Sequence, residues 1–231
     1  MKLVGERRAI AAAVMAFFFL NWLSLAISRP IPEFTKLLYS LAGVYGLAFF
    51  SLVAGYFWAR WYAIGVGVFG MIFAVVGMWQ AGTEPVLLFF GGTHLLATIF
   101  LWGQNMAGPF DGQTAWREKW HMDDNAVQRL GRSVIRAGAS LPFILVYAFA
   151  PRQVAGAEIA LVALLLTCAG MHGLVKMKTW GVVALGAAGT MLLAAGVAAF
   201  AWAPALAGGL LLAATAPFAG PIARFLFPSG T

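Results

Sequence analysis

The sequence predicts an all-α integral membrane protein made of two parallel four-helix repeats that a polar segment joins. Three observations indicate this fold. Of the 231 residues, 62% are hydrophobic and only 10% are charged, which is far from the usage of soluble domains of this size. About eight apolar runs are long enough to be transmembrane helices. The one long polar stretch, residues 106–131, divides them four and four.

The first half holds apolar runs at about residues 9–28, 37–58, 61–80 and 85–105. Lys2, Arg7 and Arg8 precede the first run, which is also the charge pattern of a signal peptide. Because the run has about 20 residues, it is long enough to cross the hydrocarbon core, and we expect a transmembrane helix. Pro30 and Pro32 end this helix.

The second half holds apolar runs at about residues 134–150, 157–174, 180–202 and 205–227. Asp123 or Asp124 has the side chain of an N-cap, so we expect a helix to begin there and to continue into the fifth run. Pro217 and Pro221 lie inside the last run, where they should break or kink the helix.

The lysines and arginines predict the orientation of the helices, because cytoplasmic loops carry an excess of both. With a cytoplasmic N-terminus and eight spans, twelve of the fifteen basic residues fall on the inner side. The inner set is Lys2, Arg7, Arg8, Arg60, Arg117, Lys119, Arg129, Arg132, Arg136, Lys176, Lys178 and Arg224, and the outer set is Arg29, Lys36 and Arg152. We therefore expect both termini in the cytoplasm and the protein in the bacterial inner membrane.

The second half of the sequence resembles the first, which predicts an internal repeat. Residues 37–47 align without gaps on residues 164–174 and match at six of eleven positions. After a shorter loop the match resumes at constant spacing, with Trp61, Gly67, Gly70, Gly77 and Pro85 opposite Trp180, Gly186, Gly189, Gly196 and Pro204. Each half has an even number of helices, so both should insert in the same orientation. The expected units are a first membrane repeat, residues 1–105, an interfacial segment, residues 106–131, and a second membrane repeat, residues 132–231.

Small residues follow one face of the third predicted helix. Steps of three or four residues separate Gly67, Gly70, Ala74 and Gly77, and the seventh predicted helix repeats the stripe with Gly186, Gly189 and Gly196. Such stripes let membrane helices approach closely. We expect these glycines to serve helix packing. A sharper hypothesis is that the two stripes form the interface between the halves.

The central polar stretch has the pattern of a segment in the head-group layer. Trp116 and Trp120 are one helical turn apart, and Arg117 and Lys119 lie between them. Tryptophan and basic residues are enriched at the cytoplasmic membrane surface. We expect these four residues to be interfacial anchors. Docking of a partner protein is the alternative.

Ionisable side chains deep in a membrane are costly, and each is therefore a hypothesis about function. All acidic and basic residues are predicted in loops or at span ends. His94, after Gly91-Gly92-Thr93, is the exception, because it lies half-way along the fourth predicted helix. It could form a hydrogen bond to a neighbouring helix, contact a ligand in a cavity together with Thr93, or be an axial ligand of haem or another pigment. His172 lies too near the end of its helix to be a good second haem ligand.

The sequence has no motif that predicts catalysis. It lacks a P-loop, a GxGxxG and an HExxH sequence, and its single cysteine, Cys168, lies in an apolar run. His121 with Asp123 and Asp124 makes a poor zinc site. We therefore predict no catalytic residue, no metal and no cofactor, with haem or a pigment as the one possible exception.

These observations leave three hypotheses for function. The basic residues flank apolar runs, so the net charge of +7 indicates contact with membrane lipid rather than nucleic acid. The leading hypothesis is a non-catalytic accessory or scaffolding subunit of a larger membrane complex, with protein partners. The second is a carrier or binding protein for a lipid-like or apolar small molecule between the two halves, with His94 as its polar contact. The third is a haem- or pigment-binding electron-transfer subunit.

Overall fold

The structure, a computed structural model, describes residues 4–103, 106, 110, 124–149 and 157–226. Every regular element in these ranges is helical. The elements are α1 (Val4–Ser28), the 3₁₀ turn η1 (Pro32–Phe34), α2 (Thr35–Ala54), α3 (Ala59–Ala81), α4 (Pro85–Leu101), α6 (Asp124–Phe149), α7 (Ala157–Val175), α8 (Thr179–Ala198) and α9 (Trp202–Leu226). The all-α prediction is therefore confirmed for the described part of the chain.

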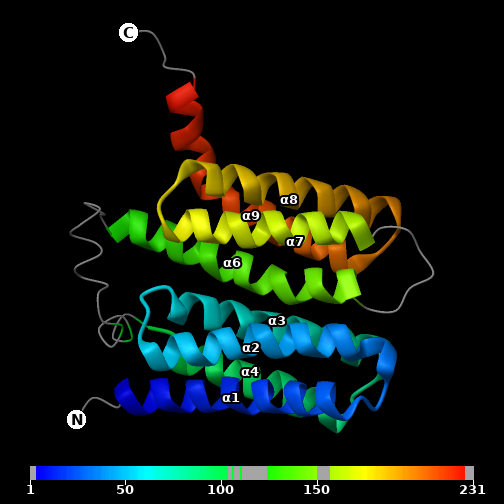
Figure 1. Cartoon of the computed structure of the whole chain (residues 1–231). Coiled ribbons are helices and arrows are strands. Elements are labelled where there is room, and N and C mark those ends of the chain that lie inside the picture. The colour runs from blue at the N-terminus through cyan, green and yellow to red at the C-terminus, as the bar shows by residue number, and fades with distance from the viewer. Residues whose placement is uncertain (1–3, 104–105, 107–109, 111–123, 150–156, 227–231) are drawn as a thin grey trace.

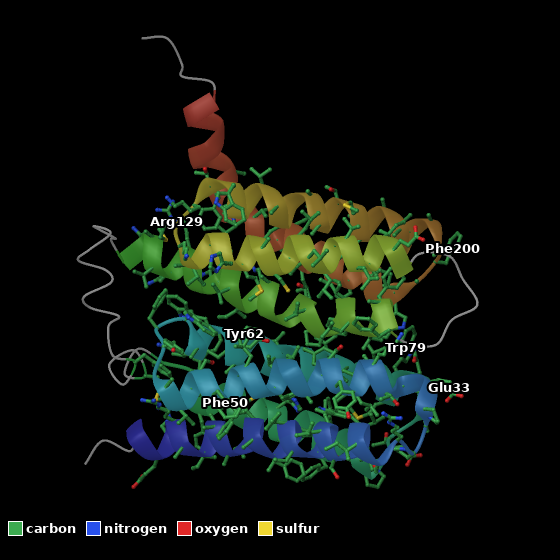
Figure 2. The ribbon with its side chains drawn as sticks, in the orientation of Figure 1. Glu33, Phe50, Tyr62, Trp79, Arg129 and Phe200 are labelled. Atoms are coloured by element: carbon green, nitrogen blue, oxygen red, sulfur yellow. The ribbon has the colours of Figure 1, made fainter. Side chains whose placement is uncertain are left out.

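The helices are compatible with an integral membrane protein. Seven of those described are long and apolar enough to cross a membrane, and α4, with 17 residues, is shorter. Large aromatic side chains are exposed near the helix ends: Trp79 is 85% exposed and Phe200 is 98% exposed. Figure 2 shows these two residues at the same end of the helices as Glu33, with Arg129 at the opposite end. Exposed aromatic residues at helix ends are typical of the membrane interface.

The helices form two groups that lie side by side (Figure 1). In the first group, α1 packs on α2 and α4, and α3 packs on α2 and α4. In the second group, α6 packs on α7 and α9, and α8 packs on α7 and α9. Helix α6 also contacts α3 and α2, so it joins the two groups. Each half is therefore a four-helix bundle, and the buried apolar residues of the two halves form one continuous hydrophobic core.

Close contact between α3 and α6 holds the halves together. A Cβ atom on Gly65 would meet the main-chain oxygen of Ile135 at 2.5 Å and the main-chain nitrogen of Ala139 at 2.9 Å. Trp61, one turn before Gly65, lies over Gly131. Phe69, one turn after Gly65, meets the ring of Phe143 edge to face, with 4.8 Å between the ring centroids. Because two residues correspond to about 200° around a helix, Gly65 and Gly67 lie on nearly opposite faces of α3.

Helix ends differ in places from the predicted runs. Helix α2 ends at Ala54 rather than 58, because Gly55 adopts a left-handed conformation with φ 76° and its N–H binds the Ser51 and Leu52 carbonyls. This is the geometry that ends helices at glycine. Helix α6 begins at Asp124, as expected from the N-cap pattern. It extends the fifth predicted run by about ten residues at its N-terminal end.

Arg136, which the sequence predicts at a span end, is half-buried and forms a hydrogen bond to another helix. This residue lies in the middle of the 26-residue helix α6. Its Nη1 donates a hydrogen bond of 2.6 Å to the main-chain oxygen of Ala213 in α9. Proline has no N–H, so Pro217 leaves this oxygen, four residues earlier, without its helical partner. Arg136 supplies the missing donor.

Helix α9 continues through Pro217 and Pro221, but its last part turns away from the bundle (red in Figure 1). Beside this bend, the Ser133 hydroxyl donates to the main-chain oxygen of Ala214 at 2.7 Å. Side chains of α6 thus hold the main chain of α9 close to the point where proline weakens its hydrogen bonding. The expected kink is present, and the helix is not interrupted.

Candidate functional site

His94 lies in the middle of α4 and is completely buried within the first bundle. Pro85 is the first residue of the helix, a position at which the N–H that proline lacks would have no partner within the helix. The buried residues of α4 are His94, Ala97, Thr98 and Leu101, which are spaced as one stripe along a helix. His94 therefore points into the bundle, where residues of α1, α2 and α3 surround it.

Both nitrogens of the His94 ring have hydrogen-bond partners in the protein. Nδ1 lies 2.6 Å from the main-chain oxygen of Phe90, one turn earlier in α4. A carbonyl oxygen can only accept, so Nδ1 carries the hydrogen and Nε2 of the neutral ring is an acceptor. The Tyr45 hydroxyl of α2 donates to Nε2 at 2.6 Å. The geometry thus fixes one tautomer and connects α4 to α2.

Aromatic rings enclose the histidine on several sides. The ring centroid of His94 is 4.5 Å from that of Phe18 in α1 and 4.2 Å from that of Phe90. The Phe18 and Phe90 rings meet each other edge to face at 5.1 Å. Trp22 packs one turn beyond Phe18, and its Nε1 is buried with no hydrogen-bond partner in the described structure. We call Phe18, Tyr45, Phe90 and His94 the histidine cluster.

Two glycines of α3 make room for the cluster. A Cβ atom on Gly70 would overlap the imidazole ring of His94, and one on Gly67 would overlap Oγ1 of Thr98. The Thr98 hydroxyl donates to the main-chain oxygen of His94 at 2.9 Å. The two glycines therefore let α3 lie directly against the face of α4 that carries the histidine.

This arrangement is suited to holding helices together. Four helices contribute to it: α1 through Phe18, α2 through Tyr45, α3 through Gly70 and α4 through His94. An axial bond from His94 to a haem or pigment metal would require Tyr45 to leave Nε2, since Nδ1 is already a donor to Phe90. The hydrogen-bonding hypothesis fits the geometry most directly, and ligand contact by His94 stays a prediction.

Thr93 does not extend the cluster. Its hydroxyl donates within its own helix, to the main-chain oxygens of Phe89 at 2.8 Å and Phe90 at 2.9 Å. Neighbouring residues project about 100° apart on a helix, and Thr93 is half-buried while His94 is fully buried. The structure therefore does not bring the two predicted ligand contacts together.

The remaining predicted glycines lie between consecutive helices of one half. Gly77 faces Leu87 of α4, Gly186 has only Thr215 of α9 near it, Gly189 faces Gly208 and Leu212 of α9, and Gly196 faces Ala205 of α9. The stripes thus lie between α3 and α4 and between α8 and α9. The hypothesis that they form the interface between the halves is wrong, because the α3 face toward α6 is that of Trp61, Gly65 and Phe69.

Other candidates do not form a site in the described part of the chain. Trp116, Arg117, Lys119, Trp120 and His121 lie outside the described residues. His172 and Cys168 are exposed, one turn apart on α7. No group of three His, Cys, Asp or Glu side chains that could hold a metal occurs in the described ranges.

Sequence reasoning missed the residues that complete the cluster. Phe90 precedes His94 by one helical turn, a spacing visible in the sequence, but nothing there indicates that Phe18 and Tyr45 come from other helices to meet it. Gly65 was hidden by the more regular stripe that begins at Gly67. No protein-family model matches this chain, and comparisons with curated proteins and solved structures also found no match.

Proposed function

We propose that this protein is a non-catalytic accessory or scaffolding subunit of a larger membrane complex. The supporting observation is that the buried polar side chains of the described helices have partners within the fold. His94 binds Tyr45 and Phe90, and the other buried polar residues, Ser51, Thr98, Ser133, Ser140 and Thr167, each donate to main-chain oxygens. The exceptions, Nε1 of Trp22 and Oγ1 of Thr35, are neither acids nor bases. A catalytic or coupled-transport site needs polar groups that remain available to its substrate.

The outer faces of the helices offer surface for such partners. Gly43 of α2 and Gly92 of α4 are exposed, and a Cβ atom at either position would meet nothing within 4 Å. Around Gly92, Phe89 is 55% exposed and Leu95 is 47% exposed. A small residue among large apolar ones makes a notch into which a partner helix can pack.

The same proposal includes eight spans in two repeats. Helix α4 is about 25 Å long at about 1.5 Å per residue, nearly the thickness of a hydrocarbon core of about 30 Å. Helix α1 begins and α9 ends on the same side of the bundles in Figure 1, which fits an even number of crossings with both termini in the cytoplasm. Equivalent glycines at α3–α4 and α8–α9 support the repeat.

Reporter fusions test this topology. Fusions after Pro30, Gly82 and Gln153 should report the outer side of a bacterial inner membrane, and fusions within residues 106–131 should report the cytoplasm. A cytoplasmic signal at Gly82 would contradict the crossing by α4 and, with it, the eight-span arrangement.

Native mass spectrometry after gentle extraction tests the function. We expect the chain to appear with protein partners in fixed stoichiometry. The variants Gly43→Leu and Gly92→Leu should be as stable as the wild type, and at least one should lose the partner. Retention of an apolar small molecule by the chain alone would instead favour the carrier hypothesis. An absorption band of haem or pigment would favour the electron-transfer hypothesis.

A further inference from the structure

Two arginines from different helices converge on the C-terminal end of α4. Nη2 of Arg7, in α1, donates to the main-chain oxygens of Ile99 at 3.0 Å and Trp102 at 2.8 Å. Nε of Arg60, in α3, donates to the main-chain oxygen of Leu101 at 2.9 Å. The carbonyls at the end of a helix carry partial negative charge, which cations stabilise, and the Ile99 carbonyl also accepts from the Trp102 N–H at 3.1 Å. The two guanidinium groups therefore cap α4 from both sides.

This capping leaves most of the positive charge and most of the donors unused. A guanidinium group has five N–H donors, and these contacts use one nitrogen of each arginine. Neither Arg7 nor Arg60 forms an ion pair with any residue that the structure describes. A helix C-terminus supplies only about half a negative charge against two positive ones. The remaining charge favours an anion beside the α4 end.

Arg8 belongs to a separate contact. Its side chain donates to the main-chain oxygens of Leu52 and Val53 at the end of α2, both at 2.7 Å. Arg7 and Arg8 are consecutive residues of α1 and therefore project in different directions. The candidate anion site thus consists of Arg7 and Arg60 alone.

Neighbouring residues place the two arginines at the depth of lipid head groups. Trp102, whose carbonyl Arg7 binds, is 61% exposed, and Tyr56, just after α2, is 56% exposed. Such aromatic residues mark the interface of a membrane. Toward the helix centres, Ile10 of α1 is 41% exposed and Ile99 of α4 is 54% exposed. The site therefore has a basic part at the interface and an apolar surface beside it.

We propose that Arg7 and Arg60 bind the phosphate of an anionic phospholipid whose acyl chains lie against Ile10 and Ile99. The planar guanidinium forks match the oxygens of a phosphate group. Basic pockets between transmembrane helices are known to bind anionic head groups. The bound lipid neutralises the arginines while they cap α4. This site is independent of the proposed protein partners.

Native mass spectrometry of the full chain in a mixture of phosphatidylglycerol and phosphatidylcholine tests the site. The wild type should retain phosphatidylglycerol in preference to phosphatidylcholine. The double variant R7Q/R60Q should retain about tenfold less phosphatidylglycerol than the wild type does. The matched control is R29Q/K36Q, which also removes two positive charges but at the other end of the helices. Retention that is equal in the wild type and R7Q/R60Q, or that falls equally in the control, would overturn the proposal.

A measurement on the wild type keeps the proposal testable if R7Q/R60Q does not fold. Phosphatidylglycerol should raise the thermal unfolding temperature in detergent more than phosphatidylcholine does, and an equal rise would overturn the site. Inorganic phosphate at the same concentration should neither raise this temperature nor displace the lipid. If inorganic phosphate raises the unfolding temperature as much as phosphatidylglycerol does, or if it displaces the lipid, the site binds free phosphate and the lipid assignment is wrong.

Discussion

The two halves of the molecule pack their helices in the same order but fill their cores differently. In the first half, a Cβ atom on Gly70 would meet the buried ring of His94. In the second half, Gly189 faces the flexible side chain of Leu212 and the main chain of Gly208. The proposed repeat pairs Gly70 with Gly189 and His94 with Ala213. The glycine contact is thus common to both halves, while among the residues that the structure describes the polar cluster occurs only in the first.

A second difference lies between the middle helices of each half. In the second half, Gly173 of α7 and Gly181 of α8 bring main chains together, since a Cβ atom on Gly173 would lie 2.7 Å from Cα of Gly181. The repeat pairs Gly181 with Tyr62 of α3, which is fully buried and donates to the main-chain oxygen of Val44 at 3.4 Å. Figure 2 shows Tyr62 at the boundary between the two halves. A large ring in place of glycine keeps α2 and α3 from the close contact that α7 and α8 make.

The largest expected effect comes from adding a methyl group at the two equivalent glycines. Gly70→Ala should destabilise the protein by more than about 3 kcal/mol, because the rigid His94 ring cannot move aside. Gly189→Ala should cost less, about 1 kcal/mol, because Leu212 can change rotamer and the other two contacts, with the main-chain oxygen of Gly208 and Cβ of Leu211 at 3.1 Å, require only small shifts. Thermal unfolding in detergent measures both, with Gly92→Ala as the control in open space. Equal losses at Gly70 and Gly189 would show that the histidine cluster does not set the difference between the halves.

Removing the polar contact within the first half should have the next largest effect. His94→Leu leaves the buried Tyr45 hydroxyl without an acceptor, which costs about 1–3 kcal/mol. His94→Gln should cost less, because an amide can again supply a donor and an acceptor. The double variant His94→Leu with Tyr45→Phe should be more stable than His94→Leu alone. If it is less stable, Tyr45 does not depend on His94 for its hydrogen bond.

The helices of this protein were predictable from sequence because membrane spans need long apolar runs. Helix α4, for example, follows from its apolar length and from Pro85 at its start. The burial of His94 was also expected, because exposing a polar imidazole ring to lipid costs free energy. The partners of His94 were not, because Phe18 and Tyr45 lie 76 and 49 residues away in the chain. Which residues meet across helices depends on packing angles that no local pattern contains.

The partner of Arg136 was not predictable for a similar reason. A single arginine in an apolar run was assigned to a span end, where its charge would be solvated. In the structure, the carbonyl of Ala213 that Pro217 leaves free lies on another helix and accepts from it. The proline was visible in the sequence, and so was the arginine, but the pairing between them required the arrangement of α6 against α9. The glycine stripes were misplaced for the same reason, since a stripe identifies a close contact and not its partner.

Coupling between Arg136 and Pro217 should be a smaller effect, confined to the second half. Arg136→Met removes a charged donor from the Ala213 carbonyl and should cost about 1–2 kcal/mol. Pro217→Ala restores an N–H that can bind the same carbonyl within α9. In the Pro217→Ala background, Arg136→Met should therefore cost about 1 kcal/mol less. Unfolding temperatures of the four proteins in this cycle measure the coupling, and additive effects would mean that the two residues do not share this carbonyl.

The smallest effect should be a gain in stability, at Gly186. A Cβ atom there would have only Cγ2 of Thr215 near it, at 3.9 Å, which is an ordinary contact. Alanine also restricts the unfolded chain more than glycine does, so Gly186→Ala should stabilise the protein by about 0.5 kcal/mol. The repeat pairs this residue with Gly67, where the same change would overlap Thr98, so Gly67→Ala should destabilise. Opposite signs at these two aligned glycines would show that the stripe is needed where α3 meets the histidine-bearing face of α4. A loss of stability in both variants would instead mean that α8 and α9 pack more tightly at Gly186 than this contact indicates.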